Sequence, residues 1–156
     1  MSRQRGVVLL LALGLSLLLG LLAAQVLHEA QARQRQVGEQ LAVARAFEQA
    51  EAGLLEGAAL LPGALPPRCV SCLPPAIPPQ APTQPWQQTA SGFVLLQHLG
   101  STTRAAGLPP SEPVTLVRVT AISGEAHARQ VLEAVYALDA SATLRRVSWR
   151  QRLQEG

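Results

Sequence analysis

The sequence predicts an α+β fold, in which one long N-terminal helix packs on a small antiparallel β-sheet and the first half of that helix spans a membrane. Three observations support this. An uncharged apolar run lies near the start of the chain, no proline precedes Pro62, and the last third contains alternating apolar and polar segments separated by turn signals. With 156 residues, the chain has room for one small domain and an anchor.

The apolar run Val7–Ala24 is long enough to cross a bilayer. It holds 18 residues without a charge, and a helix of that length spans about 27 Å. Arg3 and Arg5 precede it and the next arginine is Arg33, so we expect a cytoplasmic N-terminus and a periplasmic remainder. A secretory signal fits poorly, because the run is long and residues 22–25 are a weak cleavage site. A permanent single-pass anchor is an open alternative, because it fits the length and apolar character of this run as well as any other membrane-spanning segment does.

The helix is expected to continue beyond the transmembrane residues 7–27 as an amphipathic segment over residues 28–61. That segment is rich in Ala, Gln, Glu, Arg and Leu, which favour helix. Its apolar residues recur every three or four positions and form one stripe: Val37, Leu41, Ala44, Phe47, Ala50, Leu54, Ala58 and Leu61. We expect the chain's own sheet to cover this stripe, with a coiled coil as the alternative.

Residues 62–92 form a proline-rich connecting segment that contains the only two cysteines, Cys69 and Cys72. Pro62 and Gly63 end the helix. The two cysteines are separated by two residues, a spacing that also occurs in redox motifs and in half zinc sites, but no second pair completes a zinc site. In an oxidising periplasm we favour a local disulfide that stiffens the segment. A redox role and two free thiols are the alternatives.

Residues 93–156 are predicted to form the antiparallel sheet. Phe93–Leu99 is a compact apolar run, Val114–Ile122 places Val117, Val119 and Ala121 on one side, and Thr143–Arg150 places Val147 and Trp149 on one side. Turn signals separate these segments, which suggests a meander. Residues 126–139 satisfy both helical and strand spacing, so their structure stays open here.

Composition and charge exclude little but support no catalytic site. All 13 basic residues are arginines, the formal net charge is +3, and the arginines are scattered among 10 acids, so we expect no nucleic-acid partner. His28, His98 and His127 are isolated, without the neighbours of a catalytic triad. We therefore expect no enzyme activity, no metal and no cofactor.

Two segments resemble a known family. Gln4–Ala24, QRGVVLLLALGLSLLLGLLAA, resembles the type III signal of prepilins, in which a short basic leader ends in glycine before an apolar helix. Arg45–Leu54, RAFEQAEAGL, is similar to the second signature of PilX-type minor pilins, and Leu116–Ala121 and Arg146–Arg150 resemble that family's closing strands. The resemblance covers the first 60 residues and, less closely, the final 45; the proline-rich middle carries none of it.

The resemblance implies a type IV pilin-like fold and a processed N-terminus. Residues 1–6 would be a leader, prepilin peptidase would cut between Gly6 and Val7, and Val7 would be N-methylated. Gly14, Ser16 and Gly20 would let neighbouring helices approach closely. The partners implied are other minor pilins, the major pilin, prepilin peptidase and the inner membrane, from which the subunit would pass into the pilus.

Leu11 departs from the pattern of major pilins, which carry glutamate at this fifth mature position. A carboxylate in lipid costs about 2.5–3.5 kcal/mol unless it is paired, and a subunit placed first in the fibre has no earlier neighbour to pair with. We therefore expect a minor pilin that helps initiate type IV pilus assembly at or near the tip. The alternatives are a permanently anchored periplasmic accessory protein, a small pseudopilin of a type II secretion system and a thiol oxidoreductase.

Overall fold

Helix α1 runs from Ser2 to Leu60 without a proline. The computed structural model describes residues 2–63, 65–75, 85–109, 112–125 and 128–152, with helix side chains from residue 9 onward. The helix ends as predicted before Pro62, with the amides of Leu61 and Gly63 bonded to Ala58 O and Leu60 O. The chain divides into two compact units, residues 1–41 and 42–156, which are described separately.

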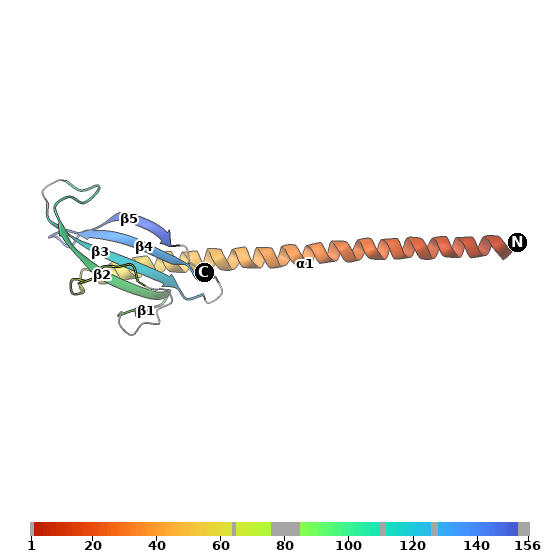
Figure 1. The fold of residues 1–156 in the computed structure, drawn as a ribbon, viewed down its shortest axis with the longest axis horizontal. Coiled ribbons are helices and arrows are strands. Elements are labelled where there is room, and N and C mark those ends of the chain that lie inside the picture. Colours follow the sequence, from red (N-terminus) through yellow and green to blue (C-terminus); the bar gives the residue numbers. More distant parts are fainter. Residues whose placement is uncertain (1, 64, 76–84, 110–111, 126–127, 153–156) are drawn as a thin grey trace. The chain divides into compact units, whose positions relative to one another are not determined.

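The second unit contains a five-stranded antiparallel sheet in the simplest order, β1-β2-β3-β4-β5 (Figure 1). The strands are β1 Gln87–Thr89, β2 Gly92–Thr102, β3 Val114–Ser123, β4 Val131–Leu138 and β5 Leu144–Arg152. Every pair of neighbours is antiparallel. The predicted α+β fold and meander are therefore confirmed.

The structure resolves the ambiguity over residues 126–139, because Val131–Leu138 is strand β4. An amphipathic helix would bury one stripe, whereas residues 131–134 are buried in succession, so both sides of this segment are covered. Strand β1 was not predicted. It falls within residues 62–92, which were expected to form only a connection, and its three residues, QQT, carry no apolar alternation.

One continuous core joins the last turns of α1 to one face of the sheet. The helix contributes Ala50, Leu54 and Ala58, the turn directly after it contributes Leu61, and the sheet contributes Val94, Leu96, Val117, Val119, Ala121, Leu132, Ala134 and Tyr136. The prediction that Val117, Val119 and Ala121 share one side of their strand is confirmed, because all three are buried on β3. At about 25 cal/mol per Å² of apolar area, this burial is the main force holding helix and sheet together.

Gly53 and Gly57 let α1 lie close against β3. A Cβ on Gly57 would stand 2.6 Å from Val119 Cγ1, and one on Gly53 would stand 3.1 Å from Ala121 Cβ. Sequence reasoning treated Gly53 only as part of a family signature and did not single out Gly57. Their role is to remove side-chain volume at the helix–sheet contact.

The buried stripe on α1 is shorter than predicted. Val37 and Leu41 are 62% and 49% exposed, and Ala44 is exposed too, so these three positions were wrongly assigned to the covered stripe. The buried stripe begins at Ala46, which the pattern had not included. The core shared with the sheet takes in α1 from Phe47 onward, and Ala46 lies directly before it.

Trp149, which the sequence pattern placed with Val147 on one side of its strand as a candidate core residue, is 41% exposed. It lies opposite Ala134 on β4, and its ring meets Phe47 edge-on with centroids 6.2 Å apart. The pairing of β4 and β5 shifts between Val135 and Tyr136, which skips Val147. This irregularity breaks the alternation of Val147 with Trp149, and the outer strand leaves the ring at the rim of the core.

The turn before β5 is built by Asp139. Its Oδ1 accepts hydrogen bonds from Ser141 N at 2.9 Å, Ser141 Oγ at 2.7 Å and Thr143 N at 2.8 Å. The Ser141 hydroxyl, followed by the Thr143 amide, holds the pKa of Asp139 below its usual value. These bonds hold the turn at residues 139–141, which sets the position of β5.

Candidate functional site

The first candidate site is the apolar surface of α1. Its leucines from Leu9 to Leu22 are 52–72% exposed. Within the described residues, α1 is the one helix long and apolar enough to cross a membrane. Such a surface needs lipid or other apolar helices around it.

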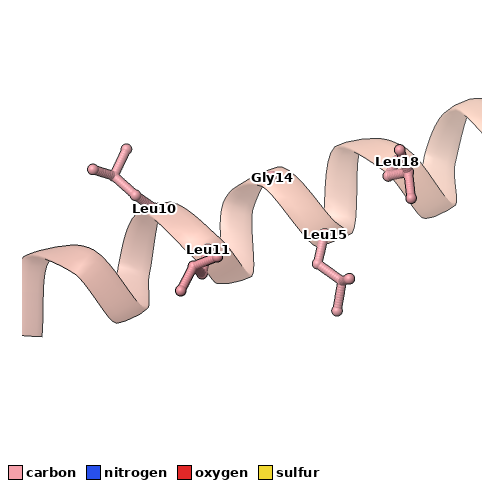
Figure 2. A pocket seen from close by; sticks show the side chains of 5 residues that line it. All are labelled: Leu10, Leu11, Gly14, Leu15 and Leu18. Atoms are coloured by element: carbon pink, nitrogen blue, oxygen red, sulfur yellow. The ribbon is translucent and has the colours of Figure 1, made fainter.

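Gly14 opens a shallow groove on this helix, lined by Leu10, Leu11, Leu15 and Leu18 (Figure 2). Nothing described lies within 4 Å of a Cβ built on Gly14 or on Gly20. The Ser16 hydroxyl donates to Ala12 O at 2.8 Å, so its polar group is satisfied within the helix. All three predicted packing residues can therefore lie against another helix without clash or unpaired polar group.

Helical geometry places these three residues on two sides of α1. At about 100° per residue, Ser16 and Gly20 lie roughly 40° apart, whereas Gly14 lies on the other side. One helix could approach at Gly14 and another at Ser16 and Gly20. Two neighbours, not one, fit this arrangement.

Gly6 and Val7 lie within the helical backbone of α1. Their side chains are outside the described residues, as are those of Arg3 and Arg5. Cleavage between Gly6 and Val7 therefore stays a prediction.

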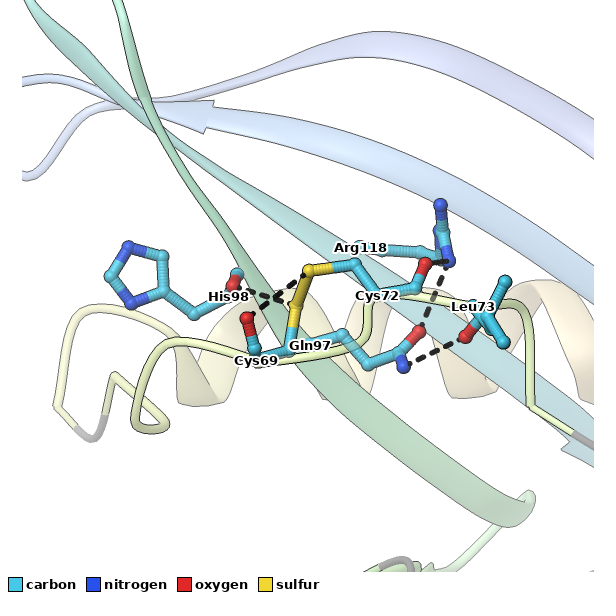
Figure 3. The surroundings of a disulfide bond; sticks show 6 residues. All are labelled: Cys69, Cys72, Leu73, Gln97, His98 and Arg118. Carbon is cyan, nitrogen blue, oxygen red and sulfur yellow. Dashed lines mark hydrogen bonds between the residues drawn. A yellow bond between two sulfur atoms is a disulfide. The ribbon is translucent and has the colours of Figure 1, made fainter.

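The second candidate site is the connecting segment that carries the cysteines. Cys69 and Cys72 form a disulfide with Cα atoms 5.4 Å apart, as Figure 3 shows. The amide of Cys69 donates to His98 O at 3.0 Å, and Arg68 pairs with His98 in an isolated parallel bridge. The disulfide is thus fixed beside β2.

Side chains of the sheet bind the carbonyl oxygens that follow the disulfide. Arg118 Nη1 donates to Cys72 O at 3.0 Å, Gln97 Nε2 donates to Leu73 O at 3.1 Å, and Arg152 Nη1 donates to Pro75 O at 2.8 Å. These residues alternate with the core residues on β2, β3 and β5, so they lie on the sheet face opposite α1. The segment is therefore tied across three strands.

Glu133 on β4 organises the arginines of this face. Its side chain is 3% exposed; Arg150 Nε donates to Oε2 at 2.7 Å, and Arg152 Nη1 approaches Oε1 at 3.3 Å. Arg150 Nη2 also contacts Oε2. Both carboxylate oxygens are therefore partnered, which a buried carboxylate requires.

Sequence reasoning missed this network. It placed Arg118 on the outward side of its strand, but did not foresee that the connecting segment would use that side. The available signal was the position of charged residues, Arg118 and Glu133, within strands whose neighbours are apolar. Such residues are rarely buried without a partner.

The isolated histidines do not come together. His28 is exposed on α1, His98 is half-buried on β2, and His127 lies outside the described residues. Across the described part of the chain, no group of three or more His, Cys, Asp or Glu side chains could hold a metal ion.

Comparisons of the chain with known protein families, with characterised proteins and with solved structures found no match. The geometry itself defines the class: one long helix, apolar in its first part, packed on a five-stranded antiparallel sheet, which is an α+β pilin-like fold. The apolar first part of the helix has the properties of a membrane anchor or signal.

Proposed function

We propose that this chain is a minor pilin that takes part in initiating type IV pilus assembly, at or near the tip of the fibre. The observation that carries the proposal is the combination within α1 of an exposed apolar first part and a last part buried under an antiparallel sheet. One helix thus supplies both a membrane-compatible surface and the core of a small domain.

The apolar part of α1 would hold the subunit in the inner membrane before assembly. On assembly it would move from lipid into a bundle of similar helices. This transfer exposes no apolar surface to water, so it avoids the free-energy cost of hydrating the leucine side chains. Close approach at Gly14 on one side, and at Ser16 and Gly20 on the other, supports packing between two neighbours.

Leu11 favours an early place in the fibre. It is 69% exposed and lies beside the groove at Gly14. With leucine here, the subunit can enter the bundle without a neighbour that neutralises a carboxylate. A subunit inside the fibre would not need this feature, whereas one that starts the fibre would.

The disulfide and the arginine-bound carbonyls support a rigid domain outside the membrane. Cys69 and Cys72 close a short loop, and Arg118 and Arg152 tie its continuation to the sheet. Such a domain suits a structural subunit. We expect no catalytic activity from it.

Mass analysis of the mature protein tests the proposal. Removal of residues 1–6 and one methyl group on the amine of Val7 are expected. An intact Met1 on the mature protein would reject a pilin role and would favour the permanently anchored accessory protein instead.

A small pseudopilin of a type II secretion system would show the same processing. It is separated by location, because a minor pilin should be recovered with sheared surface fibres and a pseudopilin should not. A thiol oxidoreductase would lose disulfide-exchange activity when Cys69 and Cys72 are replaced by serine; absence of that activity in the native protein rejects this alternative.

A further inference from the structure

Arg118 is a half-buried cation that lacks a carboxylate among the described residues. Its Nη1 donates to two neutral oxygens, Cys72 O at 3.0 Å and Gln97 Oε1 at 3.2 Å. It forms none of the ion pairs of the described chain. Its Nε and Nη2 donate to no described residue. A guanidinium partly withdrawn from water is stabilised by an anion, most strongly by one that accepts two parallel hydrogen bonds.

The neighbouring charges do not supply that anion. Among the described residues, Glu133 is the acidic residue on this part of the sheet, and its two oxygens are taken by Arg150 and Arg152. Counted over these described side chains, the three arginines Arg118, Arg150 and Arg152 lie near one carboxylate, which pairs with the last two and leaves an excess of two positive charges. This side of the sheet attracts a further negative group.

A hollow of about 210 Å³ opens beside Arg118. It is lined by residues of three adjacent strands: Arg118, Glu133, Val135, Ser148, Trp149 and Arg150. In the strand register, Arg118 pairs with Val135 and Val135 pairs with Ser148. Val135 thus forms the floor between a guanidinium and a hydroxyl. The hollow is smaller than the ~300–1,000 Å³ typical of sites for drug-sized ligands, so it suits a single small group.

We propose that this hollow binds a carboxylate. Arg118 donates to it through Nε and Nη2, and the hydroxyl of Ser148 donates from the opposite side. Arg150 adds positive charge at the rim, where its side chain is 57% exposed. Glu133 also lines the hollow, but its charge is already neutralised by two arginines. The carboxylate comes from an acidic side chain of a partner protein or from a small free acid. The proposal does not depend on the proposed pilin function.

The test is an NMR titration of the full-length protein in zwitterionic micelles at constant ionic strength. The probes are the peptide Ac-Gly-Glu-Gly-amide, its glutamine counterpart Ac-Gly-Gln-Gly-amide, and free glutarate. The glutamate peptide should give saturable shifts of the Arg118 Nε–H and Ser148 amide signals, and the glutamine peptide should not. Binding of glutarate as well identifies the carboxylate as sufficient; binding of the peptide alone identifies a protein segment as the source. Equal shifts with both peptides, or no saturable shift, would overturn the proposal.

Variants separate the hollow from general charge. Arg118→Gln should weaken peptide binding roughly tenfold or more, whereas Arg145→Gln, which removes an equal charge from an exposed site on β5, should leave it unchanged. Because Arg118 also binds Cys72 O, a second variant leaves that contact intact. Val135→Glu places a carboxylate beside Arg118 and should block the peptide, and Val135→Gln should not block it to the same degree. If Arg145→Gln weakens binding as much as Arg118→Gln does, the attraction is unspecific and the proposal fails.

Discussion

Gly57 on α1 stands so close to Val119 on β3 that a Cβ at position 57 would lie 2.6 Å from Val119 Cγ1. Val119 is fully buried, so it has no space into which to move. The close approach of helix and sheet here therefore depends on the absence of a side chain at position 57, as it does less tightly at Gly53. This contact gives the first prediction.

Gly57→Ala should destabilise the folded domain by about 1–3 kcal/mol, because the added methyl group forces the helix and sheet apart. Gly38→Ala is the matched control, since no described residue lies within 4 Å of a Cβ built there. Alanine there should be neutral or stabilise by up to ~1 kcal/mol through helix propensity. Urea unfolding of both variants in micelles measures the difference. Equal stability of the two would show that the contact is not tight.

Glu133→Ala should destabilise the domain by about 2–4 kcal/mol. The change removes the shared partner of Arg150 and Arg152 and leaves a cavity on the sheet. Because the Arg150 side chain is 57% exposed, water can solvate its guanidinium once Glu133 is removed. The loss of unfolding free energy should therefore be smaller than for a fully buried ion pair. Glu48→Ala, at an exposed position of α1, should change the unfolding free energy by less than ~0.5 kcal/mol. If Glu133→Ala lowered the unfolding free energy no more than Glu48→Ala does, the ion pairs of Glu133 would not stabilise the domain.

Reduction of Cys69–Cys72 should cost about 2 kcal/mol, as loop-closure entropy predicts for so short a loop. Thermal unfolding with and without a phosphine reductant measures this, and the Cys69→Ser, Cys72→Ser double variant should match the reduced protein. Because the core lies on the other face of the sheet, the domain should stay folded. Complete unfolding on reduction would mean that the segment contributes far more than a local brace.

Glu56 gives the domain a pH dependence of known sign. The nearby hydroxyls of Thr89 and Ser91 hold the pKa of Glu56 below its usual value, and Ser91 Oγ donates to Glu56 Oε1 at 2.8 Å. A carboxyl with a lowered folded pKa contributes stability above its unfolded pKa of about 4.3. That contribution is lost as the pH falls through the folded pKa.

Glu56→Gln should therefore be less stable than the native chain at pH 6, and the difference should shrink as the pH falls below about 4. Glu51→Gln, on the same helix but exposed, controls for the loss of one charge. Unfolding free energies at a series of pH values measure the effect. If the difference in unfolding free energy between Glu56→Gln and the native chain grew as the pH fell, the pKa of Glu56 would be raised and not lowered.

Much of the fold could be predicted because its signals are local. The proline-free stretch that ends at Pro62 correctly predicted the helix, and the alternation of Val117, Val119 and Ala121 correctly predicted the buried face of β3. The N-terminal limit of the buried stripe on α1 could not be predicted, since Val37 and Leu41 continue the three- and four-residue spacing of its apolar positions. Only the extent of the sheet decides where coverage stops.

The site on the opposite face of the sheet depends on contacts between residues far apart in the sequence. Arg152 reaches Pro75 and Arg118 reaches Cys72 through hydrogen bonds to backbone oxygens, which leave no pattern in the sequence. Strand β1 was missed for a similar reason. It is held by pairing with β2 from Val94 to Gly92, not by its own composition.

The most direct test of the pilin proposal is peptide mapping of sheared surface fibres for the segment that begins at Val7 and ends at Arg33, where trypsin cuts next. We expect this peptide in the fibres with a methylated amine at Val7, and we expect a strain without prepilin peptidase to lack it. Recovery of the chain only in the inner membrane, with residues 1–6 still attached in both strains, would contradict the pilin proposal.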